Sequence, residues 1–141
     1  MLLLFSVPLS FGQSAGVMDE FLRLETAELE PTVYLVLSAA GIVEESASPQ
    51  EAMQTLREQP WAAKIPEQKE VTLGTFSLMV MEVFDIPGGL MFTITRSRRY
   101  AAREFSFRRF LPGTSAPGRV LTPFDVVSGL TSAMEWKEKR S

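Results

Sequence analysis

The chain has 141 residues, 45% of them hydrophobic and 22% charged, which is typical of one globular domain with a small net charge of −3. It contains no cysteine and no histidine. Disulfides, thiolate metal sites, cysteine nucleophiles and Ser-His-Asp triads are therefore excluded, and carboxylates are the only common zinc ligands that remain.

The first twelve residues are apolar and uncharged, and they are too short to span a bilayer, which takes about 20 apolar residues. They are typical of the hydrophobic part of a secretory signal, and Ser10 and Gly12 are the small residues that a signal peptidase reads. We expect export to the periplasm or cell surface, with cleavage before Gln13. A buried N-terminal strand or helix is the alternative. Charges or prolines interrupt every later apolar run, so we expect no transmembrane helix.

The domain itself is expected over residues 13–136. Residues 17–29 predict a short amphipathic helix with Val17, Phe21 and Leu24 on one side. Pro31 suits the first turn of a second helix. The apolar run 33–40 is expected to be the most buried helix, with Gly41 capping its end.

Three later segments share a helix start signal. Ser48 with Glu51 predicts a capping box, Thr72 has the cap without the acid, and Thr122 has both a following proline and Asp125. Apolar residues at helical spacing follow each cap, which predicts three helices that face the core. They are Ala52, Met53 and Leu56; Phe76, Met79, Val80, Val83 and Phe84; and Val126, Val127, Leu130 and Met134.

The segment between the last two of these helices begins with a break at Pro87-Gly88-Gly89. Residues 90–95 are rich in aromatic and β-branched types, which favours a short strand. Residues 99–110 predict a helix, and 137–141 predict a frayed polar tail. The expected fold class is a mainly α domain with at most one short β element.

Residues 99–136 resemble one S-layer homology repeat. Tyr100-Ala101, Leu111-Pro112-Gly113 and the start at Thr122 match its first helix, its turn and the cap of its second helix. A weaker copy covers 33–56, residues 72–84 look like a third capped helix, and 88–104 is similar to small spirochaete envelope proteins that carry such repeats.

The resemblance implies a small domain of helical hairpins in the cell envelope. Such repeats usually bind cell-wall carbohydrate, in part through an arginine after the cap threonine. Here that position holds Pro49, Leu73 and Pro123, so the resemblance supports the fold and the setting more than it supports glycan binding.

Charge is distributed unevenly along the chain. Residues 1–90 hold 13 acids and 4 bases, a net of −9, whereas residues 91–141 hold 10 bases and 4 acids, a net of +6. Seven arginines lie between positions 96 and 119, interleaved with aromatic residues. Arginine forks bind carboxylates and phosphates and stack on aromatic rings. The predicted binding residues are Arg96, Arg98, Arg99, Tyr100, Arg103 and Arg108.

Three interpretations of this arginine cluster remain open: pairing with the acid-rich first half, binding of an anionic polymer or glycan, and binding of nucleic acid. Because we expect export, we expect no nucleic acid partner. A binding role requires Arg99 and Arg103 to point outward on one helix face, clear of acids.

The sequence favours an exported envelope binding module for a cell-wall glycan or another anionic polymer. The alternative is a scaffold or assembly module that contacts only envelope proteins. Because no motif specifies a reaction, we expect neither an enzyme nor a cofactor. A Ser-Lys pair with Lys64 or Lys69 is formally possible.

Overall fold

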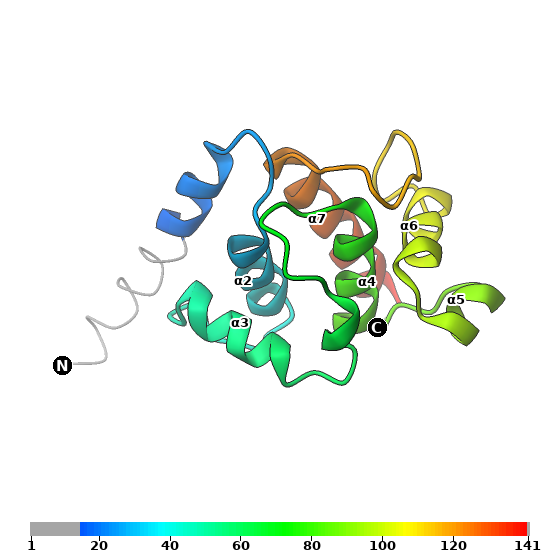
Figure 1. Cartoon of the computed structure of the whole chain (residues 1–141), viewed down its shortest axis with the longest axis horizontal. Coiled ribbons are helices and arrows are strands. Elements are labelled where there is room, and N and C mark those ends of the chain that lie inside the picture. Colours follow the sequence, from blue (N-terminus) through cyan, green and yellow to red (C-terminus); the bar gives the residue numbers. More distant parts are fainter. Residues whose placement is uncertain (1–14, 141) are drawn as a thin grey trace.

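The computed structural model describes residues 15–140, which are mainly helical and contain no sheet (Figure 1). The expected fold class is thereby confirmed, whereas the signal-like segment 1–12 lies outside the described residues. Residues 15–22 are helical, and the named helices follow. They are α2 (Leu29–Ala39), α3 (Pro49–Arg57), the 3₁₀ turn η1 (Ala62–Lys64), α4 (Leu73–Val83), α5 (Leu90–Thr95), α6 (Arg98–Phe107) and α7 (Pro123–Lys139).

Hydroxyl side chains cap four of these helices, each accepting the backbone N–H three residues ahead. The caps are Ser48 at 3.1 Å, Thr72 at 3.3 Å, Ser97 at 3.3 Å and Thr122 at 3.1 Å. Three were predicted, and Ser97 was missed. The reciprocal capping box forms at Thr122, whose N–H donates to Asp125, whereas Ser48 accepts from Glu51 without a returning bond to its own N–H. The capping box predicted at Ser48 is therefore wrong in one of its two hydrogen bonds: the cap from Ser48 forms, but the return bond from the Ser48 N–H to the Glu51 side chain does not.

Helices α2, α4 and α6 end in the same way. Each is followed by one residue with positive φ: Gly41 at 74°, Asp85 at 52° and Arg109 at 60°. The next N–H donates to the carbonyl five residues back, at 2.9 Å from Ile42, 2.9 Å from Ile86 and 3.0 Å from Phe110. This is the Schellman arrangement, which satisfies otherwise unpaired carbonyls at a helix end. The predicted cap at Gly41 is confirmed.

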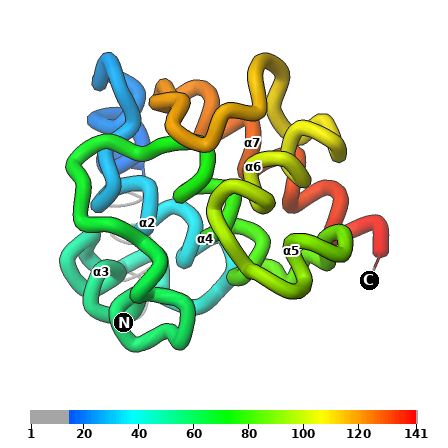
Figure 2. Tube along the Cα trace, turned by 45° about the vertical axis from the view of Figure 1, so that its right-hand side comes forward, coloured from blue at the N-terminus to red at the C-terminus, as the bar shows by residue number. Residues whose placement is uncertain are grey.

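Three extended segments meet where α2, α4 and α7 begin (Figure 2). The Ala27 N–H donates to the Leu121 carbonyl at 2.8 Å, Leu121 donates to Val71 at 3.0 Å, and Val71 donates back to Ala27 at 2.8 Å. All three residues are fully buried. Each directly precedes the N-cap of its helix, so three helices start from one closed ring of backbone hydrogen bonds, which we call the hub.

A second set of bonds follows the same pattern around the hub. The first residue of α2, Leu29, donates to the Lys69 carbonyl at 2.8 Å, and the first residue of α4, Leu73, donates to Arg119 at 2.8 Å. The first residue of α7 is Pro123, which has no N–H to donate. The three helix starts are thus related by an approximate threefold arrangement. Only the third bond of this second set is missing, because Pro123 has no N–H.

The hub also explains why the first predicted helix is too long. The structure ends this helix at residue 22, because residues 27–29 pair with Val71, Leu121 and Lys69 instead of continuing a helical turn. The predicted burial of Phe21 is correct.

The predicted strand at residues 90–95 is wrong, because these residues form α5. Within residues 15–140, no segment pairs with them to complete a ladder, and β propensity depends on such a partner. The hydroxyls of Thr93 and Thr95 instead donate to the carbonyls four residues back, at 2.9 and 2.7 Å, as helical residues do.

Two further expectations need correction. Helix α4 is more completely buried than α2, since every residue from Leu73 to Met81 is buried. Residues 137–139, expected as a frayed tail, continue α7, and the Arg140 guanidinium lies 4.2 Å from the centre of the Trp136 ring. A cation over an aromatic face stabilises this end of the helix.

One contiguous hydrophobic core joins these elements. Four aromatic rings contact one another in sequence, each pair edge to face. The ring centres are 5.6 Å apart for Phe76 and Phe105, 5.1 Å for Phe105 and Phe110, and 6.4 Å for Phe110 and Trp136. Helix α2 packs on α3, and α6 packs mainly on α4 rather than on α7. Within residues 15–140, no helix is long and apolar enough to cross a membrane.

Candidate functional site

Six of the seven arginines in the predicted cluster separate into two groups, and the seventh, Arg109, is exposed just after α6. In the first, the guanidinium groups are held by the protein itself. Arg96 pairs with Glu82 at 3.2 Å, Arg119 pairs with Asp125 at 3.5 Å, and Arg108 lies 3.7 Å from Glu104. Only the first of these pairs joins the acid-rich half to the basic half. Arg96 and Arg108, both predicted to bind a partner, are thus engaged inside the fold.

Arg108 is the most enclosed member of this group. Its guanidinium stacks 4.6 Å from the centre of the Trp136 ring and donates to the Pro87 carbonyl. It therefore ties the loop before α5 to the C-terminal helix, which is a structural role.

The second group consists of Arg98, Arg99 and Arg103 on α6, all exposed. Among the described residues, no acid and no carbonyl pairs with their guanidinium groups. Arg99 and Arg103 each lie 5.9 Å from the centre of the Tyr100 ring, one turn apart on the same face. This outward geometry, clear of acidic neighbours, is the one that a binding role requires.

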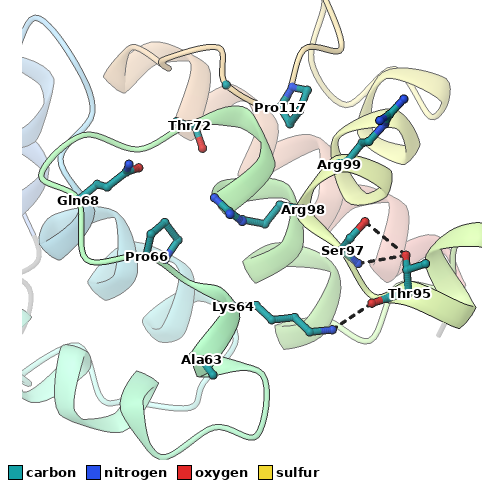
Figure 3. A pocket seen from close by; sticks show the side chains of 11 residues that line it. Ala63, Lys64, Pro66, Gln68, Thr72, Thr95, Ser97, Arg98, Arg99 and Pro117 are labelled. Carbon is teal, nitrogen blue, oxygen red and sulfur yellow. Dashed lines mark hydrogen bonds between the residues drawn. The ribbon is translucent and has the colours of Figure 1, made fainter.

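An open groove of about 760 Å³ lies beside the first turn of α6 (Figure 3). Its walls come from four segments distant in the sequence: the residues after η1, the start of α4, the junction of α5 with α6, and the loop before α7. Lining residues include Lys64, Gln68, Thr72, Arg98, Arg99 and Pro117. Figure 3 shows the Arg98 side chain extending across the middle of the groove, whereas Arg99 points away from the middle.

Gly74 lets two walls of this groove approach α4 closely. A Cβ atom at this position would stand 3.0 Å from Cβ of Arg98 and 3.1 Å from Cβ of Pro117, both tighter than ordinary contacts. The Gly74 N–H also donates to the Pro117 carbonyl at 2.9 Å. The missing side chain therefore lets α6 and the loop before α7 approach α4 closely, which brings the groove walls together.

Lys64 and Ser97 both face the groove, but other contacts engage them. The Lys64 ammonium donates to the carbonyls of Thr95 and Arg96 at 3.0 and 3.1 Å, where it caps the C-terminus of α5. The Ser97 hydroxyl caps α6 by accepting from the Tyr100 N–H at 3.3 Å. In this arrangement lysine and serine hold two helix ends in place and do not form a nucleophile–base pair with each other.

None of the described residues that line the groove carries a carboxylate. Over residues 15–140, no group of three or more acids is arranged to hold a metal ion. The cationic Arg98 and Lys64, together with the polar Gln68 and Thr72, make the groove suited to an anionic ligand that carries hydroxyl groups.

Comparison with known proteins adds no assignment: no family model, no curated protein and no solved structure matches the chain. Sequence reasoning identified Arg98 and Arg99 but missed Gln68 and Pro117 as groove residues. These two occur in polar loops without periodicity, and the pairing of residues 71–73 with 119–121 brings the two loops together.

Proposed function

We propose that this protein is an exported cell-envelope module whose groove binds an anionic polymer, in the first place an acidic cell-wall glycan. The observation that carries the proposal is Arg98, an exposed guanidinium without a protein partner that extends across the groove. A guanidinium fork binds a carboxylate or phosphate in two parallel hydrogen bonds.

The remaining groove residues fit a carbohydrate. Gln68 offers an amide for sugar hydroxyl groups, and Arg99 adds a second cation at the rim. A volume of about 760 Å³ lies in the range of small-ligand sites, about 300–1,000 Å³.

The resemblance to S-layer homology repeats supports the envelope setting. In this resemblance the caps are Ser48, Thr72 and Thr122, followed by Pro49, Leu73 and Pro123. None of these supplies the arginine that the family places after the cap, so in this chain Arg98 would provide the cation from α6.

Replacement of Arg98 by Gln tests the proposal. The change removes the charge of an exposed side chain, so the melting temperature should stay unchanged while sedimentation with purified cell wall weakens about fivefold or more. Binding of the unaltered protein should also weaken with salt, because exposed charges are screened over about 8 Å at physiological ionic strength.

Arg23→Gln is the matched control, since Arg23 is exposed and lies outside the groove. It should leave wall binding unchanged. Equal binding by the Arg98 variant and the unaltered protein would contradict the proposed site.

Export has its own test. The apolar segment 1–12 predicts that N-terminal sequencing of the mature protein finds Gln13 or a residue within a few positions of it. Recovery of intact Met1 from the cytoplasm would contradict export and, with it, the envelope setting.

The second candidate is a scaffold module that contacts only envelope proteins. It is favoured by large apolar side chains on the surface, among them Phe124, which is 75% exposed. In that case, wall binding should disappear after protease treatment of the wall and should be insensitive to Arg98→Gln.

A further inference from the structure

Helix α5 has an unusual surface for so short an element. Leu90, Met91 and Ile94 are 74%, 46% and 68% exposed, and Phe92 is its buried anchor. Figure 1 shows α5 projecting from the side of the molecule, beyond α6. Three large apolar side chains on one protruding element mark an interaction surface.

The threonine hydroxyls of α5 and the carbonyls at its C-terminal end have partners within the protein. The Thr93 hydroxyl donates to the Gly89 carbonyl at 2.9 Å and the Thr95 hydroxyl to the Met91 carbonyl at 2.7 Å. The Lys64 ammonium satisfies the carbonyls of Thr95 and Arg96 at the C-terminal end. Residues 86–95 carry no charge at all. The tip of α5 can therefore enter an apolar medium without leaving hydroxyls unpaired.

The apolar surface continues onto α6. A groove of about 490 Å³ between the two helices is lined by Leu90, Met91, Tyr100, Arg103 and Phe107, among others. Phe107 is 83% exposed. We call Leu90, Met91, Ile94 and Phe107 together the apolar patch.

The unpaired charges beside the apolar patch are cationic. Arg103 lines the same groove without a protein partner, and Arg99, like Arg103, lies 5.9 Å from the centre of the Tyr100 ring. Glu104 also lines this groove, but its carboxylate is already paired with Arg108 and accepts the Gly89 N–H. Free cations therefore flank apolar tips, with an amphipathic tyrosine between them.

We infer that the apolar patch docks on the surface of a membrane that contains anionic lipid. Leu90, Ile94 and Phe107 enter the boundary between headgroups and acyl chains, and Arg99 and Arg103 contact lipid phosphates. Apolar tips flanked by arginines are the pattern of interfacial anchors, in which long cationic side chains reach the headgroups while their stems stay apolar.

This inference goes beyond polymer binding and uses a different surface, with Arg99 alone bordering both. The polymer groove depends on Arg98, whereas membrane docking depends on the apolar patch and Arg103. Together the two surfaces would place the module between a membrane and the wall polymer.

Co-sedimentation of the full chain with vesicles tests the inference, with phosphatidylcholine vesicles compared with vesicles of phosphatidylcholine and phosphatidylglycerol. The unaltered protein should prefer the anionic vesicles. Leu90→Ser combined with Ile94→Ser should weaken binding at least about tenfold, because two large side chains lose their apolar transfer. Arg103→Gln should weaken binding to anionic vesicles about fivefold.

Phe124→Ser is the matched control, since it removes an equally exposed apolar side chain from α7 and should leave vesicle binding unchanged. Failure of the unaltered protein to bind anionic vesicles would overturn the inference. Equal binding by the Leu90/Ile94 variant would place the lipid contact elsewhere in the chain and also overturn it.

Self-association without vesicle binding, abolished by the same double variant, would assign the apolar patch to a second copy of the chain and overturn membrane docking. The two proposals fail separately. The Leu90/Ile94 variant should retain cell-wall binding, and Arg98→Gln should retain vesicle binding.

Discussion

The hub differs in burial and in backbone conformation from α5 and α6, which we call the limb. In the hub, Ala27, Val71 and Leu121 are fully buried, and their backbone groups bond one another in a closed ring. In the limb, large apolar side chains stand in solvent, and two non-glycine residues, Arg96 and Arg109, adopt positive φ.

This difference separates residues that build the fold from residues that face outward. Every feature of the hub is explained by contacts within the chain. In the limb, the apolar tips are exposed and Arg98, Arg99 and Arg103 have no acidic partner, and solvent exposure of large apolar groups is unfavourable. The limb is therefore where partners are to be sought, and substitutions should affect the two regions in different ways.

The largest expected effect is on the core that supports the hub. Phe76 on α4 is fully buried and meets the Phe105 ring edge to face. Phe76→Ala should lower the free energy of unfolding by about 3–5 kcal/mol, because it removes a buried ring and leaves a cavity. Urea unfolding measures this change. A loss comparable to that of a surface substitution would show that α4 is not the centre of the core.

A smaller loss is expected where a helix leaves the hub. Thr122→Ala removes the hydroxyl that accepts from the Asp125 N–H, so the free energy of unfolding should fall by about 1 kcal/mol. Thermal unfolding followed by circular dichroism measures the change. Thr131→Ala is a fitting control, since Thr131 is exposed on the same helix and its hydroxyl donates only to the Val127 carbonyl. No loss in the Thr122 variant would contradict its role as the cap.

The limb should tolerate change and even gain stability from it. Arg109→Gly relieves a residue at φ 60° at the end of α6, and the expected gain in unfolding free energy is about 0.5 kcal/mol. Gly41→Ala is the reciprocal variant at the end of α2, and it should lose about 1 kcal/mol. A loss of stability in the Arg109 variant would assign its side chain a structural contact.

The smallest effect on stability is expected at the tip of α5. Leu90→Ser and Ile94→Ser should each change the free energy of unfolding by less than about 0.5 kcal/mol, because both side chains are already in solvent. Chemical unfolding of each variant measures this. A loss above about 1 kcal/mol would exceed what a surface substitution usually costs. It would mean that these side chains hold α5 in place, and the contrast between hub and limb would not hold.

The parts of the fold that were predicted correctly are those that neighbouring residues determine. Caps at Ser48, Thr72 and Thr122 and the left-handed end at Gly41 depend on a few adjacent residues, and the stripe from Phe76 onward has a clear helical period. The error at 90–95 has the opposite cause. Its composition favours strand, but a strand needs a partner that the fold does not supply there.

The candidate site was predicted only in part for a similar reason. The density of arginines was visible in the sequence, but the division between engaged Arg96 and Arg108 and unpaired Arg98 and Arg103 depends on where Glu82, Trp136 and Pro87 lie in space. The polar groove was not predictable, since the hub brings its four walls together from distant segments.

The ring at the hub also bears on how the chain folds during synthesis. Ala27 and Leu121 are 94 positions apart in the sequence (121 − 27), yet each depends on the other for its backbone hydrogen bonding. A nascent chain that ends before residue 121 can form only the bond from Val71 to Ala27. Two of the three hydrogen bonds of the ring are then missing, because both involve Leu121. Contacts of such long range slow folding and leave partly made chains exposed to misassembly. An export pathway that holds the chain unfolded until its synthesis is complete would suit this topology.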